Sequence, residues 1–573
     1  MLSRIIAKAL KMRAEAKGSR NKGFGSSGIF IFNAAFDGSC ALARKRSMTK
    51  GRRLGDVMFI KILFLVLFFG VMVFVGISSM KKTKSVNDYV LGGRSVGPWI
   101  TAFAFGTSYF SSVVFVGYAG QFGWKYGLSA SFIGLGNALI GSLLAWLVLG
   151  RRTRIMTQHL NARTMPEFFA VRYGSKPIQI AGAVISFIFL VPYTASIYNG
   201  LSRLFGMAFS IDYKVCIIAM AVLTGVYVVA GGYVATAMND FIQGIIMLVG
   251  IVAVIIAVLN GRGGFLNAVK ELSLISADDV AVPALQGGQG LFASFFGPDP
   301  LNLLGVIILT SLGTWGLPQM VQKFYAIKDE KAVRTGTVVS TFFAVVISGG
   351  CYFLGSFGRL FDSPAIHTET GAVSYDSIVP EMLSTLPDVL IGIVVMLVLS
   401  ASMSTLSSLV LTSSSTLTLD FLKLWLKDKL TAKRQLLTMR VFVVFFIIVS
   451  VVLALNPPTF IAQLMGYSWG ALAGAFLAPF LYSLYWKKTT LASVWACHIF
   501  GVGFTLFNMF THVIASPINA GAVTMLAGLV IVPLVSLVTK KPDKDLVEDA
   551  FSCYGEKVTV LRSHSLAEEE AEA

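Results

Sequence analysis

The stretch LSASMSTLSSLVLTSSSTLTLDF, residues 399–421, lies inside an apolar segment that extends from residue 383 to residue 422. A segment of this length and apolarity is typical of a membrane-spanning helix that is tilted or continues into the cytoplasm. Small and hydroxyl-bearing side chains recur in it at i, i+3, i+4 and i+7, which places one stripe on one helix face: Ala401, Ser404, Thr405 and Ser408. Taken alone, the stripe is well explained by hydroxyls that bond to the i−4 carbonyl of their own helix.

The composition of the whole chain agrees with a membrane location. Of 573 residues, 55% are hydrophobic and 13% are charged, and the mean hydropathy is +0.74. Soluble domains carry about 25% charged residues. The net charge of +18 does not indicate nucleic-acid binding, because 13 Lys/Arg against 3 Asp/Glu in residues 1–57 supply +10 of it. Five scattered cysteines and five histidines without i, i+4 pairs argue against a disulfide framework, a zinc site and a metallohydrolase.

Thirteen apolar segments are long enough to span a bilayer, which predicts an all-α integral membrane protein. The expected limits are 58–79, 98–121, 128–150, 178–208, 213–231, 240–259, 301–325, 336–360, 383–422, 437–456, 459–486, 490–512 and 521–539. One set of alternate loops carries 27 Lys and Arg, among them Lys323, and the opposite set carries 5. Because basic loops remain in the cytoplasm, we predict a cell inner-membrane protein with its N-terminus outside and its C-terminus inside.

Residues 1–57 break this rule, since their basic residues would lie outside. They also lack the apolar periodicity of a domain. The sequence therefore favours a translation start at Met58, with a disordered basic extension as the alternative. A membrane domain at 58–540 and a cytoplasmic C-terminal tail at 541–573 follow.

Five blocks resemble the sodium:solute symporter family, and their motifs are nearest to those of bacterial sodium/proline-type carriers. They are VNDYVLGGRSVGPW (86–99), TMPEFFAVRYGS (164–175), GGYVATAMNDFIQG (231–244), the stretch at 399–421 and GYSWGALAGAFLAPFLYSLYWKK (466–488). One block is weakly specific, but five in the family's order and spacing are strongly specific. The resemblance covers about residues 58–540, so this region is expected to be a transporter domain.

The resemblance implies a LeuT-type fold of 5+5 inverted repeats, at about 98–259 and 301–486, whose first helices are broken near the membrane midplane. The residues fit this expectation. FGTSYFSS (105–112) and TSLGTWGLPQ (310–319) interrupt two apolar spans at corresponding places with Gly, Ser or Pro. Ordinary helix packing through small residues is the alternative interpretation.

Sodium is a hard cation and should prefer oxygen ligands. The block ASMST (401–405) matches the family's principal sodium motif. The match implies an ion bound by five oxygens. Two are the hydroxyls of Ser404 and Thr405, and three are the main-chain carbonyls of Ala401, Thr107 and Phe110.

A second sodium site, present in some family members, would use Asp240, Ser404, Ser407 and Ser408. Asp240 is the only charged residue between 231 and 261, and ionisable groups inside spans are usually functional. Alternatively, Asp240 lies at the cytoplasmic interface near a helix start, where a carboxylate suits the helix dipole. Coupling to one or to two sodium ions stays open.

The solute pocket is expected between the broken helices and the fourth span. Its candidate residues are Ser111, Ser112, Tyr193, Thr310, Ser311, Thr314 and Trp315. The block VPYTAS (191–196) resembles the proline-carrier block that places a tyrosine near the substrate, although both aromatic candidates could be packing residues. Val114 and Ile133 stand where sugar carriers have a glutamine and a glutamate, and Tyr193 stands where a sialic-acid carrier has an arginine. The expected solute is therefore a small amino acid or monocarboxylate, held partly by backbone dipoles and bound sodium.

These features predict sodium-coupled uptake of a small polar organic solute by alternating access. The expected partners are the solute, sodium ions and the lipid bilayer, with no organic cofactor. No nucleophile–base pair, phosphate loop or redox motif in the sequence indicates an enzyme. A proton-coupled symporter with Asp240 as the proton acceptor is the nearest alternative, and a channel or a transporter-like sensor are more distant ones.

Overall fold

The computed structural model describes residues 62–79, 85–209, 211–280, 282–426 and 431–555. The chain divides into two units, residues 1–63 and 64–573, and the second holds all but two of the described residues. The predictions about residues 1–57 and about the last part of the C-terminal tail therefore lie outside the described residues. Within the described residues the elements are helices, with two isolated β-bridges, which confirms the all-α prediction.

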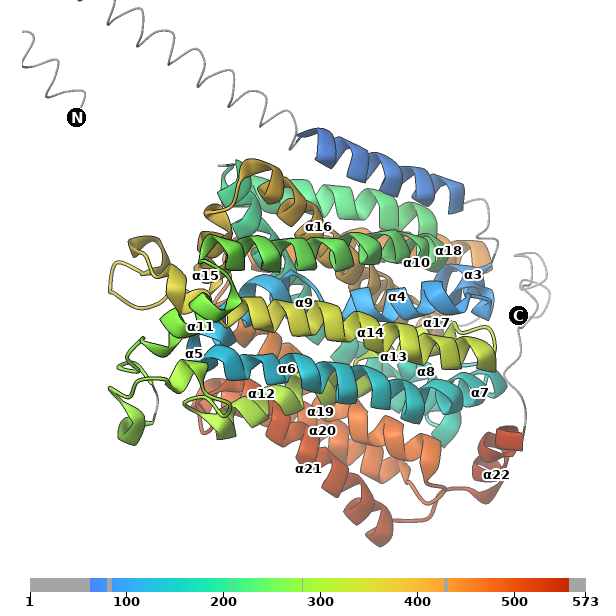
Figure 1. Ribbon diagram of the computed structural model, residues 1–573. Helices are drawn as coiled ribbons and strands as arrows, with labels where there is room; N and C mark the ends of the chain where they lie inside the picture. The colour runs from blue at the N-terminus through green and yellow to red at the C-terminus, as the bar shows by residue number, and fades with distance from the viewer. Residues whose placement is uncertain (1–61, 80–84, 210, 281, 427–430, 556–573) are drawn as a thin grey trace, which may run out of the picture. The chain divides into compact units, whose positions relative to one another are not determined.

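Figure 1 shows the helices of the second unit, where α14 runs beside α4 and α6. After a helix at Ile62–Ser79, their bounds are α3 Val86–Leu91, α4 Pro98–Tyr109, α5 Ala119–Tyr126, α6 Ser131–Gly136, α7 Arg151–His159, α8 Met165–Tyr173, α9 Lys176–Phe209, α10 Tyr213–Gly261, α11 Phe265–Ser273, α12 Pro300–Leu312, α13 Pro318–Tyr325, α14 Glu330–Gly355, α15 Tyr375–Ser384, α16 Asp388–Thr416, α17 Lys423–Leu426, α18 Ala432–Leu455, α19 Ile461–Tyr485, α20 Leu491–Thr511, α21 Pro517–Val538 and α22 Lys544–Ser552. Wider, π-helical turns join α4 to α5 and α6 to α7.

By length and composition, the described residues hold ten helices that could cross a membrane, or eleven if the bent pair α12 and α13 is one span. The predicted number of thirteen is thus approximate, because Tyr213–Val226 is an apolar helix shorter than these ten and the run Val113–His159 joins two of the predicted spans. The predicted spans 213–231 and 240–259 remain two helices within α10, which is broken at Gly232, where φ is 56° and ψ is −156°. The run Val113–His159 has 47 residues, about 70 Å of helix, so it holds parts of two spans and turns at Gly127.

Both predicted helix interruptions are present. The first helix, α4, ends at Tyr109, and Phe110 is extended, with φ −109° and ψ 104°. The second interruption bends α12 and α13 by 42°, where Leu317 is extended and Pro318 lacks the N–H that would continue the helix. A helix that stops leaves its last carbonyl groups without helical partners. Each break therefore places backbone oxygens without helical partners inside the bundle.

The two broken helices make reciprocal contacts with the two halves of the chain. Gly106 of α4 packs so closely on Phe343 of α14 that a Cβ at this position would collide with the ring. A Cβ on Gly136, at the end of α6, would lie 2.6 Å from Ile307 of α12. Each broken helix thus packs on the second span of the other half, and this reciprocity agrees with the two-fold relation between inverted repeats.

Burial separates central helices from peripheral ones. In the most apolar window of α19, 89% of the residues are buried, and in that of α16, 78% are. The corresponding share in α18 is 28%. The hydroxyl stripe therefore lies on a helix that is surrounded by protein.

Candidate functional site

The break in α4 faces the hydroxyl stripe of α16. The hydroxyl oxygens of Ser404 and Thr405 each lie 3.1 Å from the carbonyl oxygen of Thr107. They also lie 3.1 and 3.2 Å from the carbonyl oxygen of Ala401, one turn earlier on α16. All four residues are buried. Four oxygens from two helices thus converge, and we call this group the oxygen cage.

The end of α4 explains why the Thr107 carbonyl can face another helix. Thr107 lies two residues before the end of α4, in the last turn, where a carbonyl group has no helical N–H four residues later to bond to. Its own hydroxyl donates to the carbonyl of Phe103 at 2.8 Å and so stays on α4. Phe110 lies at the break itself, and its carbonyl as a fifth ligand stays a prediction.

The chemistry of the oxygen cage suits a monovalent ion. Six oxygens about 2.4 Å from a hard cation lie about 3.4 Å from one another, and the separations here are 3.1 and 3.2 Å. The four oxygens belong to neutral carbonyl and hydroxyl groups, whereas protein sites for calcium and magnesium use carboxylates. The oxygen cage is therefore better matched to sodium than to a divalent ion.

The predicted second site contains an additional residue. Asp240 of α10 is fully buried, and the Nζ of Lys323 lies 3.6 Å from its Oδ2. Lys323 also donates to the Oγ of Ser408 at 2.9 Å. Ser408 in turn shares a hydrogen bond of 2.8 Å with Ser108. The structure therefore brings Asp240 and Ser408 to one lysine.

Sequence reasoning placed Lys323 among the cytoplasmic loop charges, and this placement is wrong. The lysine lies within α13 and is 2% exposed. The sequence did indicate a buried position, since Lys323 is the only charged residue in the predicted span 301–325 and charged residues inside spans usually face the protein interior. Of the other residues of the predicted second site, Ser407 donates to the carbonyl of Ser404 at 2.8 Å.

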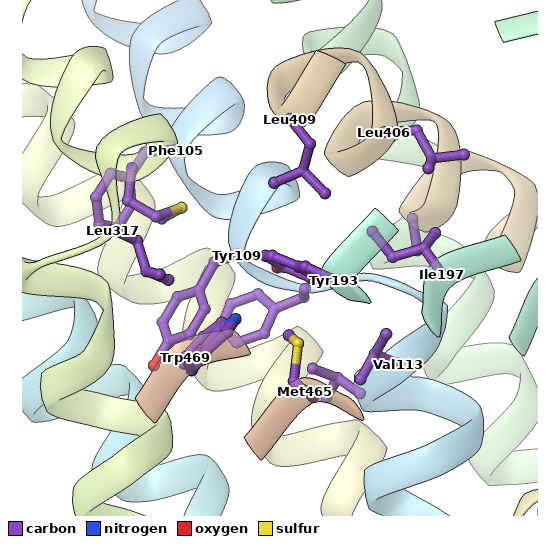
Figure 2. Packing of buried hydrophobic residues seen from close by; sticks show 14 of the residues in the cluster. Phe105, Tyr109, Val113, Tyr193, Ile197, Leu317, Leu406, Leu409, Met465 and Trp469 are labelled. Carbon is purple, nitrogen blue, oxygen red and sulfur yellow. The ribbon is translucent and has the colours of Figure 1, made fainter. Parts of the chain in front are cut away.

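Three aromatic side chains converge beside the α4 break, as Figure 2 shows. The ring of Trp469, from α19, lies 6.3 Å from that of Tyr109 and 5.9 Å from that of Tyr193, from α9. Tyr109 donates a hydrogen bond to the carbonyl of Thr310, which joins the two broken helices directly. The hydroxyl of Tyr193 and the indole N–H of Trp469 are buried, and among the described residues no hydrogen bond of ordinary geometry satisfies either one. Polar donors beside apolar ring faces are typical of a solute pocket.

The other predicted solute residues fall into two groups. Ser111 and Ser112 lie at the α4 break, and Ser112 donates to the carbonyl of Ile197 of α9 at 3.0 Å. The second group donates hydrogen bonds to the segment 137–141 and so anchors the break between α12 and α13: Ser311, Thr314 and Trp315. Sequence reasoning missed Tyr109, in the interrupted stretch 105–112, and Trp469, in the block 466–488, because an aromatic residue in an apolar span is usually a packing residue.

Comparisons with known proteins show the family and the fold of this chain. A model of the sodium:solute symporter family matches residues 89–501. The osmoregulated proline transporter OpuE of Bacillus subtilis (strain 168) is 29% identical over 495 residues, 84% of this chain and 96% of that protein. The sodium/proline symporter of Staphylococcus aureus (strain NCTC 8325 / PS 47) is 32% identical over 444 residues, 75% of this chain and 82% of that protein. A solved Na+-coupled sialic acid symporter in a substrate-bound outward-open state covers 85% of this chain and 99% of its own, with a TM-score of 0.66 at 16% identity, which confirms the LeuT-type fold.

Proposed function

Because this chain belongs to the sodium:solute symporter family, we propose that it takes up proline, or a small amino acid of similar shape, together with sodium. The family match establishes the class: a multi-pass membrane transporter, not an enzyme, that moves a small solute with sodium. The proposal adds the solute, the inward direction and the residues that bind the ion. Proline is supported by the two proline-carrying relatives.

The coupling ion is proposed to bind in the oxygen cage, with the Phe110 carbonyl as a further ligand. The observation that carries this assignment is the 3.1 Å approach of the Ser404 and Thr405 hydroxyls to the Thr107 carbonyl. An ion there would take ligands from α4 and from α16 at once. Since a ligand shifts a conformational equilibrium by its differential affinity, sodium would favour the state in which these helices are close.

The solute is proposed to lie against Tyr109, Tyr193 and Trp469. Proline combines an apolar ring with a carboxylate and an ammonium group. The aromatic faces would contact the ring, and the Tyr193 hydroxyl and the Trp469 N–H would donate to the carboxylate. The backbone N–H groups at Ser111 and Ser112, beyond the end of α4, are further donors for an anionic group.

Transport by the reconstituted protein tests both parts of this proposal. Proteoliposomes with an inward sodium gradient should accumulate labelled proline above the external concentration. Replacing sodium by choline at constant pH should abolish this accumulation, and undiminished uptake would favour proton coupling instead. Unlabelled proline should compete more strongly than alanine or lactate. Competition by lactate but not by proline would exclude the proposed solute.

The sidedness inferred from the loop charges belongs to the same proposal, with the N-terminus outside and α22 in the cytoplasm. It is supported by the 27 to 5 distribution of basic residues between the two sets of loops, although Lys323 must be removed from the first set. In a background without the native cysteines, a cysteine at Asp549, which is exposed on α22, should react with an impermeant maleimide only after cells are made permeable. Reaction in intact cells would reverse the orientation.

A further inference from the structure

We propose that the side-chain ammonium of Lys323 occupies the place of a second coupling cation, so that this chain carries one sodium ion with each solute molecule. The inference rests on the proposed function, because it concerns the ions that accompany the solute. It differs from the prediction of a second sodium site, since the same residues would hold a cation that is part of the chain.

The surroundings of Lys323 have the chemistry of a cation site. Its Nζ donates to Ser408 at 2.9 Å and lies 3.6 Å from the Oδ2 of Asp240. The centroid of the Tyr233 ring lies 5.2 Å from the same nitrogen, and the negative face of an aromatic ring attracts cations. The side chains of Lys323 and Asp240 are 3% and 0% exposed. A carboxylate, a hydroxyl and an aromatic face thus surround one buried positive charge.

Charge balance favours one cation at this place. Apart from the 3.6 Å contact with Lys323, the carboxylate oxygens of Asp240 have no hydrogen-bond partner within the described residues, so the ammonium is what compensates the buried negative charge. A sodium ion at the same carboxylate would lie within a few ångströms of the ammonium. Two cations at that distance repel strongly where the dielectric constant is low. A second sodium ion can therefore bind only when the ammonium is removed.

The position of Lys323 also connects it to the oxygen cage. Ser408 bonds to Lys323 on one side and to Ser108 on the other. Ser108 directly follows Thr107, whose carbonyl belongs to the oxygen cage. Lys323 itself lies on α13, the second half of the other broken helix. The tethered ammonium thus links both broken helices through α16, and it contributes no transported charge because it stays attached to the chain.

Counting sodium ions tests the proposal, with Lys323→Met as the main variant because methionine is neutral and of similar length. Equilibrium binding of radioactive sodium to the purified chain should give one ion per wild-type chain. It should give two per Lys323→Met chain, because the Asp240 carboxylate is then free to bind an ion. The double variant Lys323→Met/Asp240→Asn should return to one ion. The charge-conserving variant Lys323→Arg should also bind one.

Two sodium ions per wild-type chain, or one per Lys323→Met chain, would overturn the proposal. If Lys323→Met does not fold, the ratio of labelled sodium to labelled solute in wild-type proteoliposomes decides. A ratio near one supports the tethered cation and a ratio near two overturns it. Sodium-independent uptake by the wild-type chain would instead overturn the proposed function, so the two failures can be told apart.

Discussion

The guanidinium of Arg94 donates a hydrogen bond to the main-chain carbonyl of Tyr325, 3.2 Å away and 231 positions later in the sequence. It also donates to the carbonyls of Thr157 and Ala162. Arg94 precedes α4 and Tyr325 ends α13, so one buried side chain ties the ends of both broken helices to α7. Burial lowers the pKa of Arg94 to about 10, which still leaves it charged at neutral pH. These contacts close the predicted cytoplasmic end of the bundle.

Replacing Arg94 by alanine should open that end. Each buried carbonyl left without a donor costs about 1–3 kcal/mol, so the closed state should lose population. We expect a cysteine at Thr412, which is buried one turn beyond Ser408, to react with a maleimide at least tenfold faster in Arg94→Ala. The measurement requires a background without the native cysteines. Arg359→Ala is the control, because Arg359 pairs with Asp279 and bonds to the carbonyl of Trp124, at the opposite end of the span that begins with α4. An equal rise of the reaction rate in Arg359→Ala would indicate a general loosening of the bundle.

Removing one hydroxyl of the oxygen cage should weaken sodium binding more than solute binding. Hydrogen bonds to charged groups contribute about 1.5–3 kcal/mol, and roughly tenfold in affinity corresponds to 1.4 kcal/mol. In Thr405→Ala, the sodium concentration for half-maximal uptake should therefore rise roughly tenfold to hundredfold. Ser414→Ala is the matched control on the same helix, because Ser414 donates only to the carbonyl of Leu411. Unchanged sodium dependence in Thr405→Ala would exclude the oxygen cage as the ion site.

A methyl group at Gly313 should disturb the solute pocket. A Cβ at this position would lie 2.7 Å from the ring of Trp469, and overpacking of a well-filled core costs about 1–3 kcal/mol. We expect Gly313→Ala to raise the KM for the solute while the sodium dependence changes little. Gly349→Ala is the control, because a Cβ there would have no atom within 4 Å. Equal KM values in the two variants would argue against Trp469 as a solute contact.

The carboxyl group of Asp376 should make stability depend on pH. Asp376 lies on α15, outside the membrane spans, and accepts a hydrogen bond from the N–H of Ile461 at the start of α19. Burial raises its pKa from 3.8 to about 6. A raised carboxyl pKa means that the native state binds more protons than the unfolded state between these values, so stability falls as pH rises from about 4 to about 6.

Asp376→Asn should remove this dependence, because asparagine keeps an acceptor oxygen for Ile461 without the charge. The shift corresponds to at most about 3 kcal/mol. The test compares the melting temperatures of wild type and Asp376→Asn in detergent at pH 4 and at pH 7. The variant should melt at the higher temperature at pH 7, and the two temperatures should be equal at pH 4. A difference that is constant with pH would contradict the raised pKa.

The fold could be predicted because hydrocarbon surroundings restrict the chain to helices. Apolar length was sufficient for the helical bundle, whereas both breaks, at 105–112 and 310–319, were expected from the family resemblance together with their Gly, Ser and Pro residues. The break of α10 at Gly232 agrees with the two separate spans predicted there. The number of spans was less certain, because apolar length and composition do not show where a long run such as Val113–His159 passes from one span to the next.

The oxygen cage was predicted more completely than the solute pocket. A stripe at i, i+3, i+4 and i+7 defines one helix face, so Ala401, Ser404 and Thr405 were predicted to lie together. The aromatic contact between Tyr109 and Trp469 joins helices that are 360 positions apart, and no local pattern encodes such a pair. The pairing of Lys323 with Asp240 was missed for a related reason. A lysine near the end of a span looks like an interfacial residue until its partner on another helix is known.

The reciprocal contacts of Gly106 with Phe343 and of Gly136 with Ile307 bear on the energetics of the carrier. If the two halves exchange conformations, each broken helix keeps an equivalent neighbour, and the molecule opens to the other side. The two end states are then nearly degenerate, because the same kinds of contact are broken and remade. A carrier of this kind needs no large input to reverse its direction, so the ion and solute concentrations and the membrane potential decide which way net flow runs.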